Sequence, residues 1–267
     1  MSRLHDRMNA GELALGVYMK GAPHLVPTLA KAGFDFVRPD MMFSGIDWRE
    51  MEEIIRASKG TNITPWVRIA MNPWFGGEDN LQCTVDAARA FSIGAEVVQA
   101  SIASAKQVEA LLNVTKDWHR SGSGQYPATE EELKNHRKKI AGEVMLAPSI
   151  ETLTGIRDMD KILSFEGMKI IYIACTDFAE QLGHTFDYDH PEVWAAFDKI
   201  VAQANAKGVT VCANTGYIYK SKSDNIKRIR KLYEHGARIV MIQGIEFLME
   251  AYSIELLKGV RDEVGSV

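Results

Sequence analysis

The feature that most constrains the fold is the alternation, along nearly the whole chain, of short apolar segments with longer segments of helical periodicity. Eight of the short segments are rich in β-branched residues and have the length of buried strands. They are residues 13–19, 34–40, 65–71, 96–102, 144–151, 169–177, 209–214 and 238–244. Strands that alternate with helices in this way are typical of a parallel sheet.

Eight β/α units in about 250 residues close into a barrel more readily than they form an open sheet. The chain has 267 residues, of which 46% are hydrophobic, so it can fill the core of one barrel. An open doubly wound sheet is the alternative, but no Gly-x-Gly-x-x-Gly motif follows the first predicted strand. We therefore predict an α/β fold, a single (β/α)8 barrel domain over residues 1–267, with an irregular insertion at residues 117–142 near the active-site rim.

Charge and hydropathy exclude several classes of partner. The chain has 31 Lys and Arg against 35 Asp and Glu, a net charge of −4, with no long run of either sign. We therefore expect neither a nucleic-acid partner nor a membrane partner. No segment approaches the roughly 18 apolar residues of a membrane-spanning helix, and the start of the chain lacks a secretory signal pattern, so we expect a cytoplasmic protein. Three separated cysteines favour neither a disulfide framework nor a zinc ribbon.

Four polar residues stand at or near the C-terminal ends of predicted strands, where barrel enzymes build their active sites. They are Asp40, Arg68, Glu151 and Asp177. Two carboxylates on neighbouring strands, Glu151 and Asp177, can share a divalent cation and leave positions for substrate oxygens, which suits Mg²⁺ or Mn²⁺. Each carboxylate can equally serve as a helix cap or an ion-pair partner. Arg68 can hold a substrate carboxylate through two hydrogen bonds, or it can pair with Asp40.

The sequence around these positions resembles the HpcH/HpaI family of class II pyruvate aldolases, which are metal-dependent lyases of 2-oxo acids. The resemblance extends over nearly the whole chain and rests on an ordered set of short motifs. These are Ala32-Gly-Phe-Asp-Phe-Val37 followed by Asp40, Val67-Arg68, Ile150-Glu-Thr152, Phe165-Glu-Gly167, Asp177, Gly183 and His190-Pro-Glu-Val193.

The resemblance implies a role for each candidate. Glu151 and Asp177 would bind Mg²⁺ or Mn²⁺, and Arg68 would hold the keto oxygen of a pyruvate unit, with Asp40 as a second catalytic residue. The implied substrate contacts are Arg68, Ser149, Thr176, Phe43 and Trp74. A cation beside the keto oxygen would stabilise the charge that develops as a C–C bond breaks to an enolate. The resemblance also implies a homo-oligomer, with a hexamer expected, in which the last helix packs on a neighbour.

The chain departs from the family pattern in ways that affect proton transfer. The family's second-strand motif ends in a histidine base, whereas this chain has Phe43, which cannot carry a proton. The helper aspartate of the family's fourth-strand motif is replaced by Ser92, and a glutamine before the metal-binding glutamate by Ser149. A relocated base is possible at His24, His184 or Tyr217.

These observations leave three hypotheses for the function. The first is a carbon–carbon lyase of the aldolase type that acts on a 2-oxo acid through a pyruvate enolate. The second keeps the metal and the enolate but changes the outcome, as in a decarboxylase, hydratase or isomerase; decarboxylation tolerates the loss of the base best. The third is a barrel that binds a carboxylate ligand without turning it over.

Overall fold

The computed structural model describes residues 2–70, 82–102, 104–117, 129–131, 134, 144–216, 221–242 and 244–265. Eight parallel strands form a closed barrel in which each strand pairs with its neighbours in chain order and the first strand pairs with the last. The strands are β1 (Ala14–Met19), β2 (Phe36–Pro39), β3 (Thr64–Arg68), β4 (Val97–Ile102), β5 (Met145–Ile150), β6 (Ile170–Ile173), β7 (Thr210–Asn214) and β8 (Ile239–Ile242). The predicted closed barrel is therefore confirmed.

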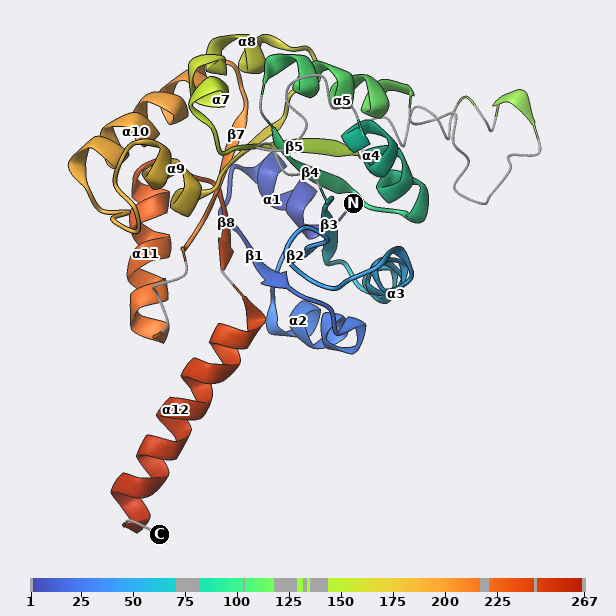
Figure 1. Cartoon of the computed structure of the whole chain (residues 1–267). Coiled ribbons are helices and arrows are strands. Elements are labelled where there is room, and N and C mark those ends of the chain that lie inside the picture. The colour runs from blue at the N-terminus through green and yellow to red at the C-terminus, as the bar shows by residue number, and fades with distance from the viewer. Residues whose placement is uncertain are drawn as a thin grey trace.

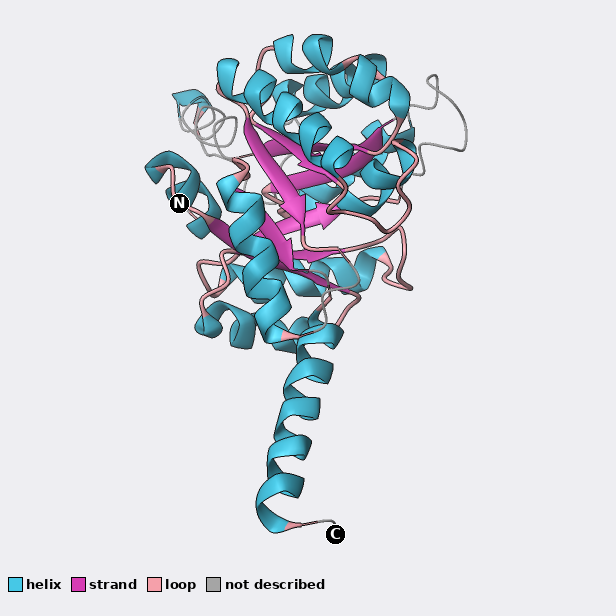
Figure 2. Ribbon diagram, turned by 90° about the vertical axis from the view of Figure 1, so that its left-hand side faces the viewer, coloured by secondary structure: helices cyan, strands magenta, loops and turns pink. Residues whose placement is uncertain are grey.

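Helices lie between the strands and surround the barrel (Figures 1 and 2). They are α1 (Arg3–Ala10), the 3₁₀ helix η1 (Pro23–Leu25), α2 (Val26–Ala32), α3 (Trp48–Lys59), α4 (Gln82–Ile93), α5 (Ala105–Asp117), α7 (Leu153–Arg157), α8 (Met159–Ser164), α9 (Cys175–Gln181), α10 (Pro191–Ala206), α11 (Lys222–Glu234) and α12 (Ile245–Val264). No helix in the described ranges is long and apolar enough to cross a membrane.

The barrel interior is filled by side chains that alternate along the strands. Phe36, Trp66 and Tyr172 meet there, with ring centroids 5.0 Å apart for Phe36 and Trp66 and 6.5 Å for Trp66 and Tyr172. Gly16 makes room for this packing, because a Cβ at that position would lie 2.2 Å from the Phe36 ring. Helix α1, which the sequence pattern did not predict, lies at the N-terminal end of the barrel, where Leu4 is fully buried against the interior side chains.

Two predicted elements need correction. The sixth strand ends at Ile173 rather than at Asp177, because the chain enters helix α9 at Cys175. Asp177 therefore lies in the first turn of a helix. The motif assigned to the fourth strand, Phe91–Ala95, lies in the end of α4 and the loop before β4.

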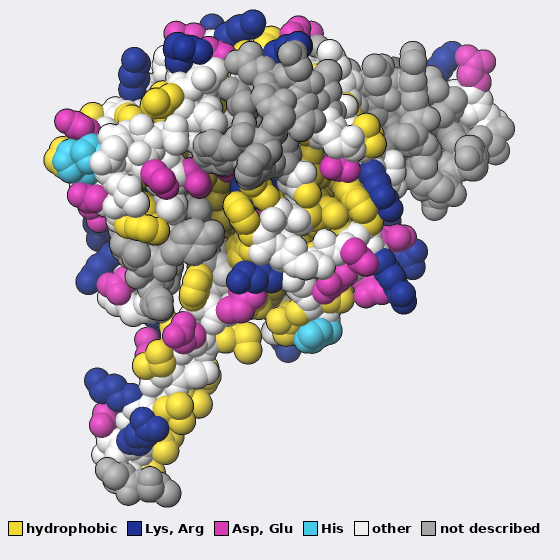
Figure 3. Space-filling view, viewed as in Figure 1, with side chains coloured by type: hydrophobic (Ala, Val, Ile, Leu, Met, Phe, Trp, Pro, Cys, Tyr) yellow, Lys and Arg dark blue, Asp and Glu magenta, His cyan; other side chains and the backbone are white. Residues whose placement is uncertain are grey.

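Helix α12 projects away from the barrel (Figures 1 and 2). None of its residues is buried, and only Ile245 and Leu248, near its start, pack against the core. Its exposed apolar residues are Met249, Tyr252, Ile254, Leu256, Leu257, Val260 and Val264. Apolar side chains run along one side of the projecting helix in Figure 3, and charged side chains lie along the other. The alternative that this helix docks on its own barrel is therefore wrong.

Candidate active site

A cluster of polar side chains fills the C-terminal end of the barrel interior. We call it the mouth cluster, and it has six members. They are Arg38 in β2, Asp40 just after β2, Arg68 in β3, Ser101 in β4, Ser149 in β5 and Glu151 just after β5. Arg38 and Asp40, and likewise Ser149 and Glu151, share one face because successive side chains of a strand point to opposite faces and the members of each pair are two positions apart. All six are buried.

Asp40 is the hub of the mouth cluster. Its Oδ2 lies 3.3 Å from Nη1 of Arg38 and 3.2 Å from Nη1 of Arg68, and its Oδ1 accepts the backbone N–H groups of Met42 (2.7 Å) and Phe43 (3.2 Å). Burial alone would raise the pKa of Asp40, but the two guanidinium groups and the two N–H donors outweigh burial and lower it. Asp40 is therefore a carboxylate that positions the arginines, and it is poorly suited to carry a proton.

Arg68 connects Asp40 with the metal-ligand candidate Glu151. Its Nη2 lies 3.0 Å from Oγ of Ser101 and 3.3 Å from Oε1 of Glu151. Burial tends to lower the pKa of Arg68, but the neighbouring charges of Glu151 and Asp40 raise it, so the guanidinium stays cationic. Of the two alternatives in the sequence, pairing with Asp40 is observed. The same guanidinium has its carbon 4.8 Å from the ring centroid of Phe43, a residue that is 60% exposed.

Glu151 is held in place through one of its two carboxylate oxygens, Oε1. Oγ of Ser149 donates to its Oε1 at 2.6 Å, and Nε2 of Gln99 donates in turn to Ser149 at 3.3 Å. Arg68 contacts the same oxygen. The hydrogen bonds and ion pairs of Glu151 within the described part of the chain all use Oε1.

Asp177 enters the site from helix α9. The start of this helix is held by Asn214 of β7, whose Oδ1 accepts the backbone N–H of Cys175 at 3.0 Å. Burial, and then the negative charge of Glu151, raise the pKa of Asp177 from 3.8 to about 6. The effect of Glu151 on this pKa is electrostatic, and no ion pair of Asp177 is present among the described residues.

The remaining sequence candidates are placed as follows. Thr176 has its hydroxyl 3.1 Å from the hydroxyl of Tyr188. Ser92, expected at the helper position, lies in the last turn of α4, where its hydroxyl donates to the Ala88 carbonyl at 2.8 Å. Because α4 runs back toward the N-terminal end of β4, Ser92 is at the opposite end of this barrel from the mouth cluster. Trp74, Tyr217 and most of the predicted insertion at residues 117–142 lie outside the described residues.

The proposed replacement base His184 is engaged elsewhere, since its Nε2 lies 2.8 Å from Oε2 of Glu192. The sequence analysis missed Arg38, Gln99 and Ser101. The alternation of side chains along a strand could have found them, because every second residue points to the same face. Arg38 precedes Asp40 by two positions, and Gln99 and Ser101 follow the buried Val97 at the same spacing.

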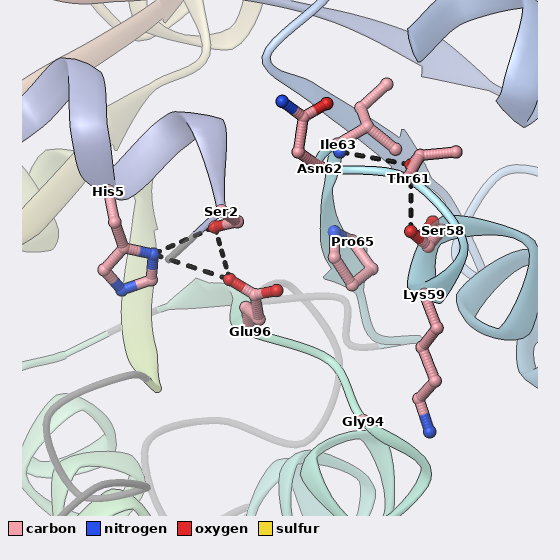
Figure 4. A pocket seen from close by; sticks show the side chains of 10 residues that line it. All are labelled: Ser2, His5, Ser58, Lys59, Thr61, Asn62, Ile63, Pro65, Gly94 and Glu96. Atoms are coloured by element: carbon pink, nitrogen blue, oxygen red, sulfur yellow. Dashed lines mark hydrogen bonds and ion pairs between the residues drawn. The ribbon is translucent and has the colours of Figure 1, made fainter.

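The cavity in Figure 4 lies at the opposite, N-terminal end of the barrel. It has a volume of about 430 Å³ and lies between α1 and the segments that lead into β3 and β4. Ser2, His5 and Glu96 form a hydrogen-bonded group on one wall. Both Ser2 and Glu96 approach the same nitrogen of His5, Nδ1, at 3.1 and 3.4 Å. A catalytic triad needs the acid and the nucleophile on opposite ring nitrogens, so this group does not have that arrangement.

Comparison with known proteins places this barrel in a family. A family model described as HpcH/HpaI aldolase/citrate lyase matches residues 17–241. A hydroxypyruvate/pyruvate aldolase of Rhizorhabdus wittichii is 25% identical in an alignment that covers 99% of this chain and 97% of the relative.

Solved structures share the fold. An HpcH/HpaI aldolase from Desulfitobacterium hafniense superposes with a TM-score of 0.78 at 18% identity, covering 98% of this chain and 97% of that one. A citrate lyase β subunit from M. tuberculosis, complexed with oxaloacetate and magnesium, gives a TM-score of 0.57 at 15% identity and covers 92% of this chain and 99% of that one. Since the family model spans the chain from β1 to β8, this chain belongs to the HpcH/HpaI aldolase/citrate lyase family, a family of carbon–carbon lyases.

Proposed function

We propose that this protein is a divalent-metal-dependent lyase that makes or breaks a carbon–carbon bond of a 2-oxo acid through the enolate of pyruvate. The observation that carries the proposal is the contact of the cationic Arg68 with the carboxylate of Glu151 at the mouth of the barrel. Burial and the charge of Glu151 also raise the pKa of Asp177, the second proposed ligand. The relative from Rhizorhabdus wittichii, a hydroxypyruvate/pyruvate aldolase, supports the substrate class.

The two carboxylates fit a hard divalent cation such as Mg²⁺ or Mn²⁺. Such cations prefer oxygen ligands, and the contacts of Glu151 with described residues use Oε1 and not Oε2. The raised pKa of Asp177 reflects burial and a repulsion by Glu151 that a cation between them would relieve. When bound, the cation supplies a positive charge beside the keto oxygen and so stabilises the enolate. The magnesium in the citrate lyase β subunit is consistent with this choice of metal.

The protein's own residues would orient the substrate. Asp40 and Ser101 hold the two terminal nitrogens of Arg68, so its guanidinium is fixed before a ligand arrives. The contact of Nη2 with Glu151, at 3.3 Å, is longer than that with Ser101, and we expect a substrate oxygen to replace it. Ser149, Thr176, Phe43 and Trp74 remain our proposed substrate contacts, with the exposed Phe43 presenting an apolar surface beside Arg68.

Phe43 favours decarboxylation as a second candidate function. The residue that the family uses to transfer a proton is replaced by a ring that cannot take part in acid–base chemistry, and Asp40 is committed to the arginines. Loss of CO₂ from oxaloacetate reaches the same pyruvate enolate without removal of a hydroxyl proton. A decarboxylase therefore needs fewer groups than an aldolase at this site.

Two assays with Mn²⁺ test both reactions. The first follows release of CO₂ from oxaloacetate, and the second follows deuterium exchange into the methyl group of pyruvate by NMR. We expect wild-type protein to decarboxylate oxaloacetate, and Glu151→Gln and Asp177→Asn to lower that rate by about 100-fold or more. We expect Phe43→His to increase pyruvate exchange at least tenfold, because an imidazole in this position restores a proton carrier.

The variants also serve as controls for decarboxylation by free Mn²⁺, which is the same in every sample. Wild-type rates equal to those of Glu151→Gln and Asp177→Asn in both assays would contradict the proposed lyase and favour a barrel that only binds carboxylates. In that case a ligand titration with pyruvate would still show binding that depends on Arg68.

We also propose that the protein is a homo-oligomer assembled through α12. An apolar hollow of about 290 Å³ lies between α11 and the base of α12, next to the exposed apolar side of that helix. Its apolar lining residues are Ile226, Ile229, Ile242, Leu248, Ala251 and Tyr252. The same helix of a second copy has apolar side chains to fill such a hollow, and a hexamer remains the expected assembly.

A further inference from the structure

We propose that His184, His190 and Glu192 form a second cation site, chemically distinct from the carboxylates at the mouth, that takes a transition metal such as Zn²⁺. Each residue offers one ligand atom, and these three atoms lie within 4.8 Å of one another. A set of two imidazoles and one carboxylate is a common donor set for zinc in proteins. The site lies in the segment between α9 and the start of α10.

The backbone holds the two histidines in place. The N–H of His184 donates to the Ala179 carbonyl at 2.8 Å, and the His184 carbonyl accepts the N–H of Asp187 at 3.0 Å. Between the histidines the chain reverses through Phe186, whose φ is +59°. The reversal brings the two imidazole rings face to face, with centroids 3.5 Å apart and planes inclined by 17°. An imidazole binds a metal in the plane of its ring, so at least one of the stacked rings would rotate about its Cβ–Cγ bond to share an ion with the other, while the backbone keeps the donor atoms near one another.

Hydrogen bonds assign the ring nitrogens. Nδ1 of His190 accepts the N–H of Glu192 at 3.3 Å and so caps helix α10 when no metal is bound. A metal on Nε2 of His190 would leave the ring proton on Nδ1, so binding through Nε2 would break this cap. Nε2 of His184 lies 2.8 Å from Oε2 of Glu192. A metal would replace the proton between these two atoms, and both would become ligands. Because the Glu192 side chain is 74% exposed, it can move outward by the few tenths of an ångström that a metal between the two atoms requires.

The donor atoms determine which metals suit the site. Imidazole nitrogen with carboxylate oxygen favours Zn²⁺, Ni²⁺ and Cu²⁺, whereas Mg²⁺ and Mn²⁺ prefer oxygen ligands. Three protein ligands leave a fourth position for water. The two proposed cation sites of this chain therefore select different metals, and a metal at His184 and His190 would tie the end of α9, the helix that carries Asp177, to the start of α10.

The test uses the full chain without an affinity tag, in a Glu151→Gln/Asp177→Asn background that removes the carboxylates at the mouth. Zn²⁺ is titrated by calorimetry in the presence of excess Mg²⁺, and Co²⁺ is added as a spectroscopic probe, because its visible absorption reports nitrogen ligands and a four-coordinate geometry. We expect one equivalent of Zn²⁺ to bind despite the Mg²⁺. His184→Gln and Glu192→Gln should each weaken binding at least tenfold.

His235→Gln is the matched control. His235 also pairs with an exposed carboxylate, with Nδ1 2.6 Å from Asp198, but no third ligand of this kind joins it among the described residues. We expect this variant to bind Zn²⁺ like the parent. No Zn²⁺ binding by the parent, or binding that His184→Gln and Glu192→Gln leave unchanged, would overturn the proposal; the second result would assign the metal to other residues. Neither result bears on the proposed lyase, which is assayed with the mouth carboxylates intact.

Discussion

The carboxyl of Asp177 is partly buried and is repelled by the charge of Glu151. These two effects raise its pKa to about 6, so its ionisation costs the folded protein free energy. In the unfolded chain the same group ionises near 3.8. The folded protein is therefore destabilised by this group progressively as pH rises from about 4 to about 6, and by a constant amount above that. A cation between the carboxylates would remove this cost.

Asp177→Asn should therefore stabilise the metal-free protein at neutral pH. We expect a gain of about 1–2 kcal/mol at pH 7.5 after allowance for partial exposure, and a much smaller gain at pH 4. Urea unfolding in EDTA at the two pH values measures the difference, and the exposed Asp187→Asn provides a control that should change little. Equal effects of Asp177→Asn at both pH values would show that burial and Glu151 together do not raise the pKa of this carboxyl.

The sequence predicted those site residues whose polar side chains stand at the end of an apolar strand. Asp40, Arg68 and Glu151 stand at such positions, and the structure brings them into contact. Arg38 was not predicted, because an arginine inside a barrel contradicts the usual burial preference. Besides Asp40 at 3.3 Å, its position is stabilised by two contacts far apart in sequence. These are Sδ of Met241 at 2.8 Å and the Tyr18 ring, whose centroid is 4.9 Å away.

Among the elements, strand β1 depends on a glycine that the barrel interior needs. Gly16→Ala would place a methyl group 2.2 Å from the Phe36 ring, which is fully buried against Trp66 and cannot move aside freely. We expect a loss of about 2–3 kcal/mol in the free energy of unfolding. Chemical denaturation measures it. Gly60→Ala is the control, because nothing lies within 4 Å of the added methyl group, and its effect should stay within about 0.5 kcal/mol.

A stability of Gly16→Ala equal to that of Gly60→Ala would show that Phe36 does not fill the space beside Gly16. Gly16 also illustrates the limits of prediction at this scale. The strand pattern placed this glycine inside β1, but the need for a glycine comes from a ring on the next strand.

The eight strands were predictable because buried parallel strands are continuous apolar runs between helical segments. The ends of the strands were less predictable, and the sixth strand shows the reason. The apolar run continues through Ala174 and Cys175, but the chain turns into α9 there, held by the hydrogen bond from the Cys175 N–H to Asn214 on β7. A contact between residues 39 positions apart in sequence decided the boundary, and it moved Asp177 from a strand to a helix. Helix α1 was missed because its sequence is mostly polar, with Leu4 as its fully buried apolar residue.

At the scale of the whole molecule, α12 packs on its own barrel only through Ile245 and Leu248 near its start, and none of its residues is buried. Its 20 residues span about 30 Å. Met249, Tyr252, Leu256 and Val260 recur at helical spacing and lie exposed on one side. An apolar stripe of this kind, carried on a projecting helix, indicates a surface that another subunit covers.

We therefore expect wild-type protein to have a solution mass that is a multiple of 29.8 kDa. Leu256→Glu should shift it toward the monomer, because a buried charge in the interface is costly. Light scattering coupled to size-exclusion chromatography measures the mass. Lys258→Glu is the control. It lies two residues away on the same exposed helix and changes the net charge by more than Leu256→Glu does, yet it should leave the assembly intact. A wild-type mass of 29.8 kDa would contradict assembly through α12.

The projection of α12 also bears on how long a subunit survives. Helices without tertiary contacts are marginally stable in water, so a subunit separated by dilution would lose the order of this segment. An unwound, apolar segment is a preferred substrate for proteases and for quality-control chaperones. The amount of the protein in the cell would then regulate its own turnover: newly made chains that find no partner are degraded, and assembled ones persist.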